Sequence, residues 1–201
     1  MKRIAIIGSG GAGKSTLARK RGQTFFEQFE EGTGMNKIFI VGIVASGKTT
    51  LAKQLSEQLR IPWYELDAIV HHRIESGRTK RTAEEQLEII MDIDRNGSWI
   101  LEGTDRDSYQ FLYQMAEKII FVDTPLKVRR WRILSRFLKQ KLGLEPCHYK
   151  PDLHMLRMMF KWTNDFERNK TAFEAKLQKH GNKVVRWSET KRKRPNGFAA
   201  P

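Results

Sequence analysis

Ile38-Phe-Ile-Val-Gly-Ile-Val-Ala-Ser-Gly-Lys-Thr49 is the stretch that decides the fold of this 201-residue chain. Its last eight residues fit the pattern G-x-x-x-x-G-K-[ST], in which backbone N–H groups and a lysine surround phosphate groups. The apolar run before the pattern predicts a β-strand. The spacing of Leu51, Leu55 and Leu59 after it predicts an amphipathic helix. A strand, a glycine-rich loop and a helix N-terminus in this order predict a nucleoside triphosphate site.

The same pattern occurs earlier, at Gly8-Ser-Gly-Gly-Ala-Gly-Lys-Ser15, after the apolar run Ile4-Ala-Ile-Ile7. At an offset of 34 residues (48 − 14), identical residues recur at Met1/Met35, Ile4/Ile38, Ile6/Ile40, Gly8/Gly42, Gly13/Gly47, Lys14/Lys48, Thr16/Thr50, Leu17/Leu51 and Ala18/Ala52. We interpret residues 1–34 as a partial duplicate strand–loop–helix extension, docked as an extra βα unit at the sheet edge. The pattern leaves open whether the first loop binds nucleotide.

Composition limits the class of protein. With 39% hydrophobic and 30% charged residues, the chain is typical of a globular domain with one core. No apolar run approaches the roughly 20 residues of a membrane span, so we expect no membrane partner. The single cysteine, Cys147, excludes an internal disulfide and suits the cytoplasm.

The net charge of +14 favours anionic partners such as nucleotides, nucleic acid or an anionic membrane. One basic cluster has no acidic residue between its members, which are Lys127, Arg129, Arg130, Arg132, Arg136, Lys139 and Lys141. A second run, Lys191-Arg-Lys-Arg194, lies in a segment, 189–201, that we expect to be a disordered basic tail. Contact with nucleic acid is the alternative interpretation of both clusters.

The remaining chain alternates strands and helices. We expect helices at 49–60, from 82 (with Leu87, Ile90 and Met91 facing inward), 108–116, 126–142 and 155–177, strands at 63–66, 98–101, 118–122 and 183–186, and loops at 71–80 and 143–152. This order predicts an α/β protein of the P-loop NTPase type, with three α/β/α layers around a mostly parallel sheet. Residues 35–188 would form that domain.

From Met35 onward the chain resembles the adenylate-kinase-like P-loop kinases, and most of all the small bacterial proteins labelled DNA topology modulation proteins. The matching stretches are the loop at 42–49, IPWYELDAI at 61–69, SWILEGTDR at 98–106 and KIIFVDTPLKVRRWRILSR at 118–136. They span most of residues 35–140. The resemblance implies ATP and Mg²⁺ as cofactors and a lid at about 137–152.

The second loop carries the expected phosphate contacts. Lys48 would reach the β- and γ-phosphates, and the Thr49 hydroxyl would bind Mg²⁺. The backbone around them would bind phosphate oxygens, so the cofactor-binding set is Gly42, Ala45, Ser46, Gly47, Lys48, Thr49, Thr50 and Arg132.

Acidic residues follow the predicted strands, at the sheet edge where ligands bind. The resemblance assigns Glu102 to Mg²⁺ through water, with Asp123 as the competing interpretation. It assigns Asp67 to the phosphate acceptor, where this residue is also the candidate general base. Arg106 matches an acceptor-binding arginine.

Arg132 and Arg136 lie four residues apart on the basic helix, with Arg129 one turn earlier. The resemblance places them around ATP, where a planar guanidinium suits phosphate oxygens. Trp131 and Phe137 are expected to pack in the core.

Two weaker patterns are assigned no chemistry. His71-His72 is interpreted as a loop pair. Cys147, His148 and His154 lack the fourth ligand of a structural zinc site.

The leading hypothesis is an ATP-dependent kinase that acts on a nucleotide, a nucleoside or another small metabolite. The alternative is a nucleic-acid-associated nucleotide-binding protein with little or no kinase activity. The sequence leaves the acceptor and the oligomeric state open.

Overall fold

The computed structural model describes residues 25–26, 29, 35–74, 77–145 and 152–188. The first loop copy at 8–15, Cys147 and His148, and the tail at 189–201 lie outside these residues. Predictions made for them are therefore not addressed by the structure.

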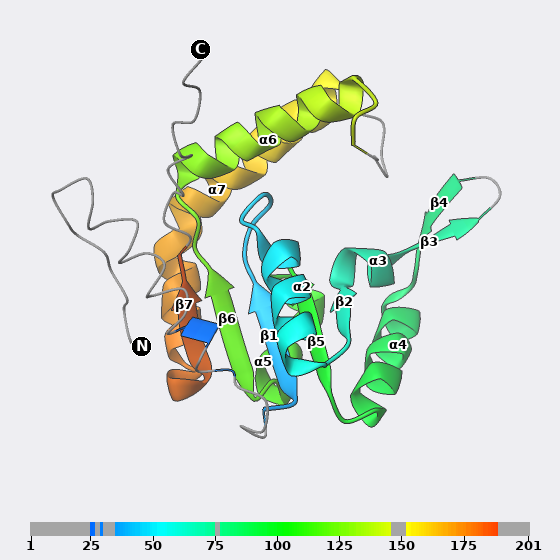
Figure 1. Ribbon diagram of the computed structural model, residues 1–201, viewed down its shortest axis with the longest axis vertical. Helices are drawn as coiled ribbons and strands as arrows, with labels where there is room; N and C mark the ends of the chain where they lie inside the picture. The colour runs from blue at the N-terminus through cyan, green and yellow to red at the C-terminus, as the bar shows by residue number, and fades with distance from the viewer. Residues whose placement is uncertain (1–24, 27–28, 30–34, 75–76, 146–151, 189–201) are drawn as a thin grey trace, which may run out of the picture.

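Five parallel strands form the central sheet, in the order β2-β5-β1-β6-β7 (Figure 1). They are β1 (Lys37–Val41), β2 (Trp63–Glu65), β5 (Trp99–Gly103), β6 (Lys118–Val122) and β7 (Val184–Trp187). All four neighbouring pairs are parallel. β1 lies in the centre, and its two neighbours, β5 and β6, follow much later in the chain, so its carboxyl end is a topological switch point.

Helices cover both faces of the sheet, which confirms the predicted three-layer α/β/α fold. They are α2 (Lys48–Leu59), α3 (Leu66–Val70), α4 (Ala83–Arg95), α5 (Leu112–Met115), α6 (Leu126–Lys141) and α7 (Leu153–Gln178), with 3₁₀ turns at Asp107–Tyr109 and Gly181–Lys183. None of these helices is both long and apolar enough to cross a membrane.

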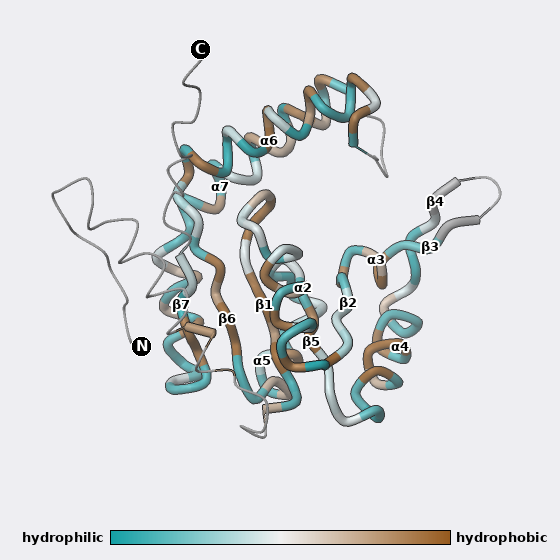
Figure 2. The backbone as a smooth tube through the Cα atoms, in the orientation of Figure 1, coloured by the Kyte–Doolittle hydropathy of each residue, from teal (hydrophilic) through white to brown (hydrophobic). Residues whose placement is uncertain are grey.

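The alternation of β1 side chains divides the core into two layers. Ile38 and Ile40 join a cluster under α2, whereas Phe39 and Val41 join one that includes residues of α4, α5 and α7. Figure 2 shows the central strands as the most continuously hydrophobic part of the backbone. Strands buried on both faces are typical of parallel sheets.

Helix α4 begins as predicted and buries Ile90 as predicted, but the other two residues expected to face inward are exposed. The Thr82 hydroxyl accepts the Glu85 N–H, and the Glu85 carboxylate accepts the Thr82 N–H, which completes a capping box. The prediction for Leu87 and Met91 is wrong, because their side chains are 45% and 40% exposed. Gln86 takes an inward position instead, since it accepts a hydrogen bond from the buried Tyr109 hydroxyl.

The predicted loop at 71–80 is an antiparallel hairpin of β3 (His71–Ile74) and β4 (Gly77–Lys80). The prediction of a loop is therefore wrong. This hairpin stands apart from the main sheet (Figure 1), so its sequence has no need of the apolar alternation that marks a half-buried strand.

Helices α6 and α7 pack side by side beyond the end of β6. Arg129 is buried between them and donates to the Thr124 carbonyl, the Thr163 hydroxyl and the Glu167 carboxylate. It therefore joins the two helices and does not face the loop, contrary to prediction. Trp131 is 66% exposed, which makes its predicted core position wrong, while Phe137 is half-buried.

Three phenylalanines from the N-terminal segment pack against the α2 face of the sheet. Phe25 and Phe29 are fully buried, and the Phe25 ring centroid lies 4.3 Å from that of Trp187. The Gln58 side-chain amide donates to the carbonyls of Phe26 and Phe29 at 3.0 and 2.9 Å. These residues are therefore part of the domain core and close its side near β7.

Candidate phosphate and acceptor site

The loop between β1 and α2 has a backbone suited to an anion. Ala45 and Gly47 adopt positive φ angles of 59° and 99°, a type of conformation found in anion-binding backbone nests. At Gly42, an added Cβ would lie 2.9 Å from both the Val122 carbonyl and the Ser46 hydroxyl. Only glycine fits there without displacing the strand end of β6.

The N-terminus of α2 opens directly onto this loop. Its N-cap, Gly47, supplies no side-chain hydrogen bond, and the first turn holds no acidic residue. The partial positive charge of the helix end is therefore not offset locally by the helix's own side chains. The Ser46 hydroxyl is buried and finds no hydrogen-bond partner in the described part of the chain. A buried polar atom of this kind fits a loop built to take a phosphate oxygen.

Lys48 and Thr49 meet Glu102 at the first turn of α2. The Thr49 hydroxyl donates to the Glu102 carboxylate at 2.5 Å, and the Lys48 ammonium lies 4.0 Å from the same carboxylate. The ammonium also donates to the Ile43 carbonyl at 3.2 Å, inside the loop. The structure thus brings together three of the predicted site residues.

Burial shifts the pKa values of Lys48 and Glu102 in opposite directions. Desolvation lowers the pKa of Lys48 below its ordinary value, although Glu102 and Asp67 act to raise it. Desolvation raises the pKa of Glu102, against the attraction of Lys48, and the nearby carboxylates of Glu65 and Asp67 add to the rise. Perturbed groups facing one loop are typical of a functional site.

Glu65 is a site residue that the sequence analysis missed. It pairs in register with Glu102 across the β2–β5 ladder. A carboxylate at the end of a strand is a signal for a site residue, but the predicted strand continued to Leu66, so Glu65 was not recognised as its last residue. β2 ends at Glu65, and Asp67 lies in the first turn of α3.

Protein side chains alone do not form a complete metal site among the described residues. Among the described residues, no three carboxylate, imidazole or thiol groups converge closely enough to hold a metal ion. Mg²⁺ usually takes one or two protein ligands together with substrate phosphates and water. The Thr49 hydroxyl beside the Glu102 carboxylate fits that donor set.

Asp123, the competing acid, is engaged elsewhere. It accepts hydrogen bonds from Lys170 at 2.6 Å and from Arg186, so it joins β6 to α7 and β7. Burial acts to raise the pKa of Asp123, but the hydrogen bonds from Lys170 and Arg186 outweigh burial and hold the pKa below its ordinary value.

Arg132 reaches the loop from α6. Its guanidinium donates to the Ser46 carbonyl at 3.1 Å and to the Ala45 carbonyl at 3.4 Å. Thr124, which the sequence analysis did not single out, holds the same Ser46 carbonyl at 2.6 Å. Arg136 lies one turn further along α6, forms an ion pair with Glu145 at 3.5 Å, and is one of the charges that lower the pKa of Lys48.

Asp67 and Arg106, the two residues predicted to contact the acceptor, form an ion pair of 2.6 Å. Both side chains are accessible, with 61% and 37% of their surface exposed. The loop after β5 therefore places Arg106 opposite α3, as expected for two residues that face one ligand.

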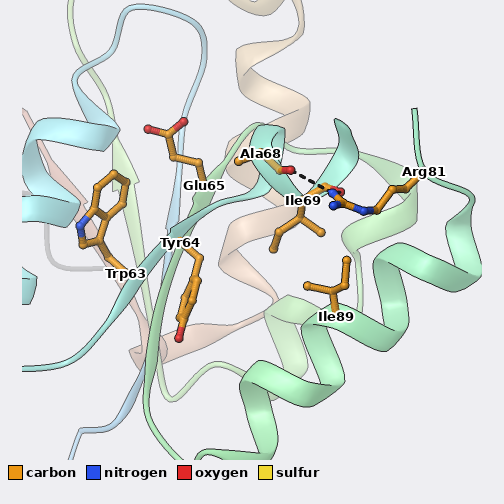
Figure 3. Close-up of a pocket in the computed structure, with 7 residues that line it drawn as sticks. All are labelled: Trp63, Tyr64, Glu65, Ala68, Ile69, Arg81 and Ile89. Atoms are coloured by element: carbon orange, nitrogen blue, oxygen red, sulfur yellow. Dashed lines mark hydrogen bonds between the residues drawn. The ribbon is translucent and has the colours of Figure 1, made fainter. Parts of the chain in front are cut away.

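An open pocket of about 420 Å³ lies between β2, α3 and α4, and neither Asp67 nor Arg106 lines it. Figure 3 shows its lining, which is Trp63, Tyr64, Glu65, Ala68, Ile69, Arg81 and Ile89. Tyr64 and Glu65 leave β2 in opposite directions, as successive residues of a strand must. Arg81 shapes one wall, because it donates to the Ala68, Ile69 and His71 carbonyls at the end of α3.

No family model matches the chain, and no curated protein matches its sequence. Several solved structures are similar in architecture. An unliganded sugar kinase from Janibacter sp. HTCC2649 is 19% identical, with a TM-score of 0.37 and coverage of 65% of this chain and 95% of that chain. A shikimate kinase from Aquifex aeolicus vf5 is 15% identical, with a TM-score of 0.39 and coverage of 77% and 87%.

A gluconokinase from Sinorhizobium meliloti 1021 is 13% identical, with a TM-score of 0.42 and coverage of 78% of this chain and 84% of that chain. At these TM-scores the likeness does not bear on the substrate of the present chain.

Proposed function

We propose that this chain is a P-loop kinase that binds ATP and Mg²⁺ at residues 42–50 and transfers the γ-phosphoryl group to a small molecule. The observation that carries the proposal is the convergence of Lys48 and Thr49 on the Glu102 carboxylate, beside a loop with two positive φ angles. The acceptor is a nucleotide, a nucleoside or another small metabolite.

Phosphoryl transfer depends on positioning and charge neutralisation more than on covalent chemistry. The N–H groups from Ala45 to Thr50 would bind phosphate oxygens, and the Lys48 ammonium would exchange the Ile43 carbonyl for the β- and γ-phosphates. Arg132 and Arg136 would stabilise charge on the transferring group from the α6 side. Mg²⁺, bound near Thr49 and Glu102, would neutralise the phosphate oxygens.

On the acceptor side, Asp67 is the candidate general base for a hydroxyl acceptor, and Arg106 would bind and orient that acceptor. The ion pair between them supports this assignment, because it holds the two accessible side chains side by side before a ligand binds. Glu65, in register with Glu102, would add a second carboxylate near the metal.

The choice of Glu102 over Asp123 for the metal rests on their partners. Asp123 would have to leave two cations to serve a metal, whereas Glu102 already holds the Thr49 hydroxyl. We assign the catalytic machinery to residues 35–188, since the loop and its partners all lie within this range, while Phe25 and Phe29 complete the core of the same domain.

The nucleic-acid-binding alternative receives no specific support from the α6 side chains that motivated it. Arg129 is buried against α7, and Arg132 donates to the loop carbonyls. Both arginines therefore have structural or phosphate-site partners within the fold.

Two matched variants test which of the two loops, 42–49 or 8–15, binds ATP for turnover. Lys48→Ala should abolish ATP binding and turnover, while Lys14→Ala, the equivalent change in the first copy, should leave most of both. Fluorescent nucleotide binding and an ATP-consumption screen over nucleosides, nucleotides and metabolites provide the readouts. Greater damage from Lys14→Ala would show that the working loop is assigned wrongly, and ATP binding without consumption of any acceptor would contradict the kinase assignment.

A further inference from the structure

Helix α6 has an exposed apolar face that the phosphate site does not use. Its members, which we call the α6 stripe, are Trp131, Leu134, Leu138 and Leu142. They recur at intervals of three and four residues, so they lie along one face of the helix and its C-cap. Trp131, Leu138 and Leu142 are 66%, 51% and 70% exposed, which is unusual for large apolar side chains gathered on one face.

The two other faces of α6 already have partners. Arg129 and Ile133 are buried on the α7 side, and Arg132 faces the loop at Ala45 and Ser46. The α6 stripe occupies the remaining angular sector. In Figure 1, α6 runs along the upper rim of the molecule, beyond the ends of the sheet strands. A flat surface could approach this rim without displacing α7 or the loop.

Positive charge beside the α6 stripe favours an anionic partner. Lys127, Arg130, Lys139 and Lys141 are exposed on α6, and no acidic residue occurs from Leu126 to Leu144. An apolar stripe with basic flanks is the pattern of helices that lie in the interface of anionic membranes. The same charges would repel a second copy of α6 across a symmetric contact, which disfavours self-association.

Nucleic acid fits the basic flanks but not the stripe. Single-stranded nucleic acid gains affinity from aromatic side chains on which bases stack. Three of the four stripe residues are leucines, which offer no ring for stacking and gain most from an apolar environment. Lipid acyl chains supply that environment, and lipid headgroups supply the negative charge.

We propose that the outward face of α6 is a docking surface for an anionic phospholipid bilayer. The α6 stripe enters the boundary between headgroups and acyl chains, and Lys127, Lys139 and Lys141 contact the headgroup phosphates, while Arg130 donates to Asn164 on α7. The sequence-based expectation of no membrane partner rested on the lack of a spanning run, which interfacial binding does not require. Arg132 stays on the loop side of α6, so lipid and nucleotide are accommodated together.

Vesicle co-sedimentation of the full chain tests this surface. We expect binding to phosphatidylcholine vesicles that contain about one-third phosphatidylglycerol to be roughly tenfold tighter than binding to phosphatidylcholine alone. The double variant Trp131→Gln/Leu138→Gln should weaken binding to the anionic vesicles about tenfold. Lys127→Gln/Lys141→Gln should weaken it by a similar factor and flatten its salt dependence.

Leu87→Gln/Met91→Gln is the matched control, because it removes exposed apolar side chains of similar size from α4. It should leave vesicle binding unchanged, and circular dichroism should show that the Trp131→Gln/Leu138→Gln variant remains folded. The proposal is overturned by equal binding to both vesicle types, by no binding to either, or by an equal loss in the α4 control. Salt-sensitive DNA binding that requires Trp131 and Leu138, without vesicle binding, would assign the face to nucleic acid instead.

Discussion

At the residue scale, Lys48 and Glu102 are charged groups that burial drives toward neutrality. The pKa of Lys48 is lowered and that of Glu102 is raised, so the ionised pair that the proposed mechanism requires exists over a narrower pH range than two exposed groups would allow. A bound triphosphate and Mg²⁺ would compensate both charges, which links ligand binding to protonation.

This pairing predicts a bell-shaped pH profile for kcat/KM of ATP consumption. As pH falls, Glu102 takes up a proton above the range of an ordinary glutamate and the acidic limb appears early. As pH rises, Lys48 loses its proton below the range of an ordinary lysine and the alkaline limb appears early. Glu102→Gln should remove the early acidic limb and raise the Mg²⁺ concentration needed for half-maximal activity.

The matched control is Glu84→Gln, at an exposed glutamate on α4 that should leave the profile unchanged. A wild-type acidic limb at the ordinary glutamate range, with Mg²⁺ dependence unaltered in Glu102→Gln, would argue against the metal assignment.

The loop residues of the candidate site could be predicted because their chemistry follows from spacing along the chain. Lys48 and Thr49 are fixed by one local pattern, and Glu102 by its place at a strand end. Glu65 was missed because its role comes from register with Glu102, a relation between strands far apart in sequence. Arg129 was placed wrongly because periodicity gives the faces of a helix but does not say which neighbour each face meets.

At the element scale, strands and long helices were predicted where apolar periodicity was strong. β1, β5 and β6 carry such runs, and the structure places all three at the expected positions. The hairpin β3–β4 was missed because strands that stand apart from the core need no apolar alternation. On α4, Ile90 is buried as predicted, whereas Leu87 and Met91 are exposed, because the buried face also includes Gln86, which accepts a hydrogen bond from Tyr109.

Asp123 illustrates how one carboxylate joins three elements. Its pKa is lowered, so its contribution to stability is present above the ordinary aspartate range and is lost as pH falls through the lowered value. We expect Asp123→Asn to lower the free energy of unfolding by about 2–3 kcal/mol at neutral pH, because Lys170 and Arg186 lose their partner. Nucleotide affinity should remain near that of the wild type.

Chemical denaturation at a series of pH values provides the measurement. The difference between wild type and Asp123→Asn should shrink as pH falls below the ordinary aspartate range. Asp92→Asn is the control, since its exposed pair with Arg95 should contribute less than about 1 kcal/mol. Loss of Mg²⁺-dependent turnover in a stable Asp123→Asn protein would instead favour Asp123 as the metal-binding acid.

At the scale of the whole molecule, the N-terminal segment is less separate than the duplication suggests. The duplication predicts an extension at residues 1–34, yet Phe25 and Phe29 are fully buried and pack with Ile38, Ile40 and the partly buried Trp187. The 34-residue repeat could not predict this packing, because a repeat relates positions along the chain and gives no contacts between distant segments.

We therefore expect Phe25→Ala and Phe29→Ala each to lower the free energy of unfolding by about 3–5 kcal/mol. A chain that begins at Met35 should be strongly destabilised, since it loses both rings and leaves Trp187 uncovered. Phe26→Ala, at a half-buried ring, is the control and should cost less. Equal stability of the full chain and the chain from Met35, in urea denaturation followed by circular dichroism, would show that the segment is dispensable.

The contact between Phe25 and Trp187 joins positions 162 residues apart (187 − 25). During synthesis the phenylalanines leave the ribosome 162 residues (187 − 25) ahead of Trp187, their partner on β7. At roughly 5–20 residues per second, these rings wait on the order of ten to thirty seconds for Trp187. The final closure of the α2 face is therefore a late event in folding, and the exposed rings are natural sites for chaperone binding until then.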